Sequence, residues 1–223
     1  MKLMKQMELK LPARGGKRKG AGRKPKGDKA GVSHVRRPDF KPRHPVHVTM
    51  RLLPGVGFLR GYSRRRAIEN ALREVKLRFG MRVVHYSIQG NHLHLIVECD
   101  EPSALSRAIQ GLAIRLARAL NRLAGRAGKV FSDRFHSHVL KTLREVVCAV
   151  PYVLENFRHH LREDVAPQGA DPCSSAGWSG DDGPFSAPRT WLLLQVAESP
   201  VRTNSSGRTA RSTRYQPRAI CCR

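Results

Sequence analysis

The chain has few acidic and few aromatic residues. Its 223 residues include 17 Asp and Glu against 42 Lys and Arg, a formal net charge of +25 at pH 7, and only 6% are aromatic. Hydrophobic residues make up 40%, which is enough for one core but not for 223 fully packed residues. No run of about 18 apolar residues occurs, so the sequence predicts no membrane-spanning helix.

Two further absences concern the compartment and the partner. The five cysteines have no CxxC or metal-like spacing, so we expect reduced thiols in a cytoplasmic protein. Residues 1–11 contain three lysines but no apolar stretch, so we expect no secretory signal. The excess positive charge favours a polyanionic partner. With the membrane set aside, nucleic acid is the leading partner class.

Positive charge is concentrated near the N-terminus. Residues 1–45 contain 15 Lys and Arg against 3 acidic residues, and residues 46–164 contain 20 against 10. The last 59 residues contain 7 against 4. We therefore expect three parts: a basic, disordered DNA-binding leader over 1–43, a folded domain over 44–164, and a linker with a disordered basic tail over 165–223.

The leader contains Gly15–Gly27, which reads GGKRKGAGRKPKG. It has no apolar periodicity, and its glycines and proline disfavour both helix and strand. Such a segment cannot bury enough surface to offset its conformational entropy. It can lie along phosphates or in a minor groove, and the alternative is a solvated, solubilising tail. The basic side chains expected to contact DNA are Arg14, Lys17, Arg18, Lys19, Arg23, Lys24 and Lys26.

Residues 46–162 alternate between strand and helix patterns. Period-2 alternation predicts strands over 46–52, 81–89, 92–99 and 130–141. Helical spacing predicts helices over 63–79, 102–123 and 143–162, and Thr142 with Glu145 matches a capping box before the last of these. The order β-α-β-β-α-β-α predicts an α+β fold of the ferredoxin-like split βαβ type. Its antiparallel four-stranded sheet carries two helices on one face, and a further helix follows.

His92 and His94 are the sharpest candidates for chemistry. Residues i and i+2 of a strand share a face, so both imidazoles project together, while Leu93 projects into the helix-packed core. Two neutral imidazoles can occupy two positions around a divalent metal. In the simple split βαβ layout the opposite face of the sheet has no helix, which would leave the pair accessible. The alternative is two ordinary polar residues on an exposed strand face.

The last predicted helix contains Tyr152 and Asn156. These are four residues apart and therefore lie on one helical face. A tyrosine hydroxyl near a metal-held phosphate can act as a nucleophile, and an amide oxygen can be a third ligand. Asn is less favourable than Leu or Ala within a helix, which suggests a side-chain role. The alternative for Tyr152 is a core aromatic with its hydroxyl satisfied at the surface.

Taken together, these segments resemble a known family. VHVTMR, MRVVHYSIQGNHLHLIVE, RFHSHVLKT and YVLENFRHH follow one another in the order found in the HUH single-strand DNA transposases with one catalytic tyrosine. The basic GGKRKGAGRKPKG resembles the leader of their REP-associated relatives, the RAYT proteins, which are the most similar branch. The resemblance covers about residues 15–163 and implies a bacterial, nucleoid-associated protein.

The resemblance also implies a mechanism. It makes His92 and His94 metal ligands, Asn156 the third ligand and Tyr152 the nucleophile. The implied activity is metal-dependent nicking and joining of hairpin-flanked single-stranded DNA through a 5′-phosphotyrosine, with Mg²⁺ or Mn²⁺ as the cofactor. Relatives include monomers and homodimers, and the sequence leaves this choice open.

Some polar residues have two interpretations. His47, Arg51 and Arg134 are expected to contact DNA, although each can be an ordinary surface residue. Glu98 shares the strand face of His92 and His94, and we expect it to be solvated. The chain departs from the family at Phe157, where many relatives have proline, and beyond Leu194, where the resemblance stops.

Three other functions compete with the transposase interpretation. A hairpin-DNA-binding protein that has lost catalysis would lack a covalent tyrosine adduct. A plasmid replication initiator with HUH chemistry usually carries further regions for which 223 residues leave no room. A small zinc protein would need a third and fourth ligand at the usual spacing.

Overall fold

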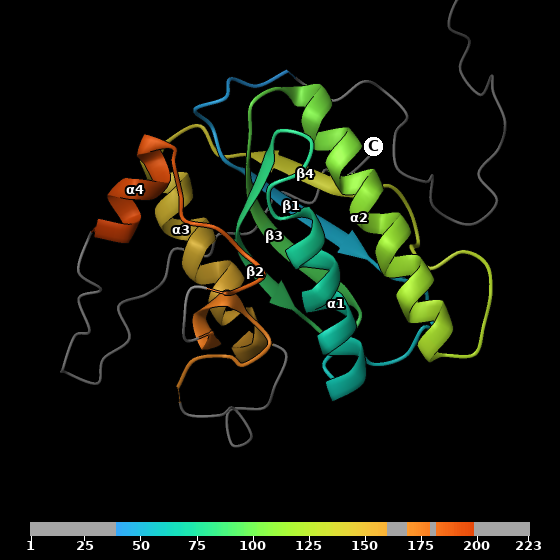
Figure 1. Cartoon of the computed structure of the whole chain (residues 1–223). Helices are drawn as coiled ribbons and strands as arrows, with labels where there is room; N and C mark the ends of the chain where they lie inside the picture. Colours follow the sequence, from blue (N-terminus) through green and yellow to red (C-terminus); the bar gives the residue numbers. More distant parts are fainter. Residues whose placement is uncertain (1–38, 160–168, 179–181, 199–223) are drawn as a thin grey trace, which may run out of the picture. The chain divides into compact units, whose positions relative to one another are not determined.

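The computed structural model describes residues 39–159, 169–178 and 182–198 (Figure 1). None of the helices within these residues is long and apolar enough to span a membrane. The elements are β1 (Val46–Arg51), α1 (Tyr62–Val75), β2 (Met81–Ile88), β3 (His92–Cys99), α2 (Pro102–Leu123), β4 (His136–Val139), α3 (Leu143–Glu155), the 3₁₀ turns η1 (Asn156–His159) and η2 (Ser175–Gly177), and α4 (Trp191–Glu198).

The four strands form one antiparallel sheet in the order β2-β3-β1-β4. β1 and β3 are central, and β2 and β4 are the edges. This order, with α1 and α2 as the two crossover helices, confirms the predicted α+β, ferredoxin-like fold. The predicted additional helix is also present: α3 follows β4 and contains Tyr152.

α1 and α2 lie side by side over one face of the sheet (Figure 1). In α2, apolar residues recur every three or four positions and therefore form one stripe. This stripe shares a core with Leu93, Leu95 and Val97 of β3, as the strand alternation predicted. The residues that α2 contributes are Leu105, Ala108, Ile109, Leu112, Leu116 and Leu120.

α3 and α4 pack on the opposite side of the sheet and form a second core. Val84 of β2 and Ile96 of β3 point to this side and are fully buried there. The expectation that this face has no helix is therefore wrong, because the apolar stripe of α3 needs cover and these two residues provide it. The helical residues of this core are Val146, Ala149, Val150 and Val153 of α3 and Leu192 and Leu193 of α4.

α3 begins at the predicted capping box. The Thr142 hydroxyl accepts a hydrogen bond from the Glu145 backbone N–H (3.2 Å), and the Glu145 carboxylate accepts one from the Thr142 backbone N–H (2.9 Å). The helix ends at Glu155 and tightens into η1, although the pattern predicted a helix to residue 162; residues 160–168 lie outside the described part. Pro151 lies inside α3 and supplies no N–H to its hydrogen bonds.

β4 is shorter than the predicted strand over 130–141. An isolated bridge joins Leu52 to Phe131, and regular pairing resumes only at His136. Between them, the Asp133 carboxylate accepts a hydrogen bond from the Arg134 backbone N–H at 2.7 Å. An acidic side chain bonded to adjacent backbone favours a bend, so the alternating pattern spans two short pieces.

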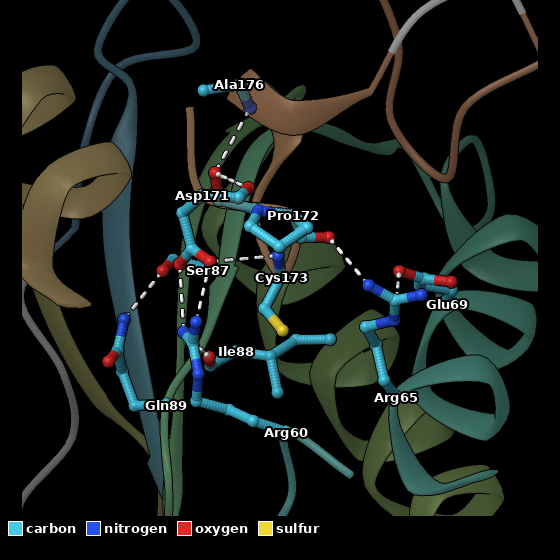
Figure 2. Close-up of polar contacts among 11 residues, drawn as sticks. Arg60, Arg65, Glu69, Ser87, Ile88, Gln89, Asp171, Pro172, Cys173 and Ala176 are labelled. Atoms are coloured by element: carbon cyan, nitrogen blue, oxygen red, sulfur yellow. Dashed lines mark hydrogen bonds and ion pairs between the residues drawn. The ribbon is translucent and has the colours of Figure 1, made fainter. Parts of the chain in front are cut away.

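Part of the segment predicted as a linker packs against the sheet domain. The carboxylate of Asp171 accepts two hydrogen bonds from the Arg60 guanidinium, at 2.7 and 2.9 Å (Figure 2). Arg60 also donates to the Ile88 carbonyl at 3.0 Å, and the Ile88 N–H donates to the Cys173 carbonyl at 2.8 Å. These contacts connect residues 169–178 to the end of β2. The predicted domain boundary near 164 stays a prediction.

Glu98 connects the sheet to the start of α4. Its carboxylate accepts hydrogen bonds from the backbone N–H of Arg189 (2.9 Å) and of Thr190 (2.7 Å) and lies 3.5 Å from Arg82. The expected solvated position is wrong, since Glu98 is 5% exposed. A carboxylate at the first turn of a helix satisfies N–H groups that have no partner within the helix.

Candidate active site

His92 and His94 lie side by side on β3. Their ring centroids are 4.8 Å apart and the rings are nearly perpendicular. His92 is half-buried, whereas His94 is 4% exposed. The two residues share a face as the HxH spacing predicted. The expected open surface is corrected for His94, because α3 packs on this side of the sheet.

β1 supplies two further groups to the pair. Thr49 lies directly opposite His94 in the sheet register, and its hydroxyl is 3.2 Å from His94 Nδ1. Nε2 of His47 is 3.0 Å from the same nitrogen, and the two rings stack at a centroid distance of 5.2 Å. His47 is therefore part of a histidine cluster with His92 and His94. Its expected surface position is wrong, since it is 2% exposed.

Burial controls the charge of His47. Desolvation, together with repulsion from His136 and His138 on the neighbouring strand β4, lowers the pKa of its imidazole to about 4. The ring is therefore neutral at pH 7. In a neutral imidazole one ring nitrogen donates a hydrogen bond and the other accepts one.

Tyr152 faces the histidine cluster from α3. Its ring meets that of His94 edge-on at 5.6 Å and that of His47 at 6.0 Å, measured between centroids. Burial raises the pKa of its half-buried hydroxyl, so the phenol is protonated at pH 7. The sheet and the helix thus bring together three side chains that lie at least 47 residues apart in sequence on β1, β3 and α3.

Asn156 follows one turn after Tyr152, where α3 passes into η1. The residue is 2% exposed, and its side-chain Nδ2 has no hydrogen-bond partner among the described residues. A buried amide without its full set of hydrogen bonds costs stability, so the fold alone does not explain it. The oxygen and nitrogen of an amide exchange places by a flip, so the atom without a partner can be either of the two.

The donor atoms suit a divalent cation in kind. No group of three or more His, Cys, Asp or Glu side chains within the described ranges is placed to hold a metal ion. The available set is instead two imidazoles and the amide of Asn156. Imidazole nitrogen and amide oxygen are ligands for divalent metals, and the incompletely bonded amide fits this use. The residues present therefore fit a metal held by His92, His94 and Asn156.

The other residues predicted to contact DNA lie at different places relative to the histidine cluster. Arg51 is exposed and lies opposite His92 in the sheet register, so it is beside the cluster. Arg134 is exposed, precedes β4 in the chain and lines a cavity of about 370 Å³ with Phe131 and Phe135. The leader residues Arg14, Lys17, Arg18, Lys19, Arg23, Lys24 and Lys26 lie outside the described residues.

The comparisons with known proteins bear directly on this domain. Residues 45–150 match the family model of the IS200-like transposases. The sheet domain belongs to the IS200-like transposase family. The match includes His47, His92 and His94 and ends two residues before Tyr152. No protein with a curated description matches the chain.

Solved structures resemble this domain to different degrees. One is a REP-associated tyrosine transposase bound to a REP hairpin, with 18% identity and a TM-score of 0.51 over 71% of this chain and 98% of that one. Another, from Deinococcus radiodurans R1, is thought to be a transposase; it shares 13% identity at a TM-score of 0.38 over 57% of this chain and 96% of its own. The first supports the fold of the IS200-like domain, and the second is too dissimilar to add to it.

Sequence reasoning missed two residues of the site. Thr49 and Asn91 both contact the paired histidines, Thr49 from β1 and Asn91 from the position just before β3. The alternation of 46–52 put Thr49 on the polar face of its strand, but its opposition to His94 needs the sheet register. Asn91 lies between the strands predicted over 81–89 and 92–99, in a turn where its side chain has no predictable direction.

Proposed function

We propose that the protein nicks and rejoins single-stranded DNA beside hairpins, through a 5′-phosphotyrosine on Tyr152. The observation that carries this proposal is the edge-on approach of the Tyr152 ring to His94, at 5.6 Å. A tyrosine next to paired histidines combines a nucleophile with groups that can hold a scissile phosphate through a cation. The family of the sheet domain and the hairpin bound by the REP-associated structure support DNA as the substrate.

The first step is a transesterification at phosphorus. The Tyr152 oxygen attacks the scissile phosphate, so a P–O bond to tyrosine forms and the P–O3′ bond breaks. The phenolic proton passes to solvent, and the leaving strand takes up a proton as its 3′-OH. The new tyrosine ester retains a phosphodiester bond, so the 3′-OH of another strand can reverse the step and join the DNA without ATP.

In this proposal, residues of the chain hold the cation and attract the DNA backbone. His92, His94 and Asn156 would hold Mg²⁺ or Mn²⁺, which, when bound, polarises the phosphate and compensates charge in the transition state. Burial raises the pKa of Tyr152, so the phenol is not ionised in advance and must lose its proton as it attacks. The exposed guanidinium of Arg51 beside His92 would attract the DNA backbone.

A covalent adduct is the decisive observation. The full chain is incubated with labelled hairpin-flanked single-stranded DNA and Mn²⁺ and is resolved on a denaturing gel. We expect a protein–DNA band that disappears with EDTA and in Tyr152→Phe. Tyr62→Phe is the matched control, because Tyr62 is 66% exposed at the start of α1 and takes no part in the cluster. It should form the adduct like the wild type.

Other results would point elsewhere. DNA binding without an adduct at any divalent metal would contradict the catalytic proposal and favour the hairpin-binding protein that has lost catalysis. An adduct that persists in Tyr152→Phe would assign the nucleophile to a different residue.

A further inference from the structure

The two paired histidines are both held through the same ring nitrogen. The side-chain oxygen of Asn91 is 2.8 Å from His92 Nδ1. The hydroxyl of Thr49 and Nε2 of His47 are 3.2 and 3.0 Å from His94 Nδ1. Two side chains from β1 and one from the turn before β3 thus contact Nδ1 of the two rings.

For His92, the contact determines the position of the ring proton. An amide oxygen only accepts hydrogen bonds, so with the Asn91 oxygen at this position His92 Nδ1 carries the proton and donates it. In the neutral ring the lone pair is then on Nε2. Asn91 is itself held in place, because its carbonyl accepts a hydrogen bond from the Leu52 backbone N–H at 2.9 Å. The end of β1 thereby fixes the residue that orients His92.

For His94, the contacts to Nδ1 come from the neighbouring strand β1. Thr49 lies opposite His94, and His47 lies on the same face of β1, two residues earlier. With Nδ1 occupied by these two groups, ligation of a cation by His94 falls to Nε2, which must then be unprotonated. In that tautomer the proton is on Nδ1, where His47 Nε2 or the Thr49 hydroxyl can accept it.

We propose that Asn91 and His47 are positioning residues that hold His92 and His94 in the Nδ1–H tautomer, so that both Nε2 lone pairs are ready for one divalent cation. This inference rests on the proposed function for its metal. A hydrogen-bonded Nδ1 fixes ring orientation and makes Nε2 a better ligand, and loss of such a partner typically weakens metal binding about tenfold to hundredfold. The two imidazoles would thus be arranged before the metal or DNA arrives.

The first test reads the tautomers directly. Long-range ¹H–¹⁵N correlation spectra of the metal-free full chain at pH 8, labelled at histidine, separate the Nδ1–H from the Nε2–H form. His92→Gln and His94→Gln identify the signals. We expect the Nδ1–H form for both rings. A proton on Nε2 in either ring would overturn the proposal, and this measurement needs neither activity nor metal.

The second test measures Mn²⁺ affinity by calorimetry on the full chain. Asn91→Ala and His47→Leu should each bind Mn²⁺ about tenfold to hundredfold more weakly. Asn91→Asp and His47→Gln keep an acceptor near the same place and should restore most of the affinity, which a purely structural role would not explain. His85→Gln is the matched control, since His85 is another largely buried histidine but contacts Ser175 outside the cluster.

The outcomes separate this inference from the proposed function. Tight Mn²⁺ binding with the expected tautomers but without a DNA adduct would retain the inference and reject the catalytic proposal. A wild type that does not bind Mn²⁺, or Asn91→Ala and His47→Leu variants that bind it unchanged, would overturn the inference.

Discussion

Asp171 and Arg60 form a buried ion pair that connects residues 169–178 to the sheet domain. The side chain of Asp171 is fully buried, and that of Arg60 is 15% exposed. Asp171 also accepts a hydrogen bond from the Cys173 backbone N–H at 3.0 Å. The Asp171 carboxylate thus accepts hydrogen bonds from both the Arg60 side chain and the Cys173 backbone. Removing its charge leaves the largely buried guanidinium of Arg60 without its ion-pair partner.

Asp171→Ala is expected to lower the free energy of unfolding by about 3 kcal/mol, the usual cost of breaking a buried ion pair. Urea unfolding at pH 7 measures the change. The control is Asp182→Ala, which alters an exposed carboxylate and should shift stability by less than about 0.5 kcal/mol. Equal stability of the two variants would mean that residues 169–178 do not depend on the Arg60 contact.

His85 makes stability depend on pH. Burial lowers the pKa of its imidazole to about 4, against about 6.5 in an unfolded chain. Between these two pKa values the unfolded state binds more protons than the folded state. The contribution of His85 to the free energy of unfolding is therefore fully present above about pH 6.5 and is lost as the pH drops toward 4. His85→Gln should reduce this fall, as measured by urea unfolding at pH 7, 6 and 5. His47 shifts in the same direction, so part of the dependence should remain.

The capping box sets the start of α3 and thereby the helix that contains Tyr152. Thr142→Ala should destabilise the protein by about 1 kcal/mol, because the Glu145 backbone N–H loses its acceptor. Thr142→Ser keeps a hydroxyl at the same position and should stay within a few tenths of a kcal/mol of the wild type. Thermal unfolding of the three proteins distinguishes a lost cap from a lost methyl group.

Elements with a local signal were predictable from the sequence, and contacts between distant segments were not. The alternation around His92 and the Thr142 cap depend on neighbouring residues, so β3 and the start of α3 were expected correctly. The burial of Glu98 depends on Arg189 and Thr190, 91 and 92 residues away. The cover of Ile96 by α3 is likewise a packing result, so the sequence predicted an exposed face.

The candidate site shows the same division. The sequence predicted the paired histidines and the Tyr152–Asn156 spacing, because each pair lies within one element. His47 was predicted at the DNA surface, since alternation shows which face of a strand is polar but not whether a helix covers it. Thr49 and Asn91 were missed because their roles depend on register and turn geometry.

At the scale of the whole molecule, charge predicts how DNA is held. Residues 1–30 contain 11 Lys and Arg against 2 acidic residues, and six of the basic residues lie in Gly15–Gly27. Replacing these six with Gln should weaken DNA binding and reduce the slope of log K against log salt by up to about 4–5. Fluorescence anisotropy at several salt concentrations measures both quantities. Unchanged affinity and slope would mean that the leader does not contact DNA.

Pro151 divides α3 into two halves that are joined by one backbone hydrogen bond fewer than in an uninterrupted helix. Because proline has no N–H, the carbonyl of Val147 receives no hydrogen bond from position 151. Val150 before Pro151 and Val153 after it both pack in the second core, and the turn with Tyr152 and Asn156 is joined to the first half by one hydrogen bond fewer. The helix can bend at this joint at lower cost than elsewhere, and Tyr152 is the residue directly after it.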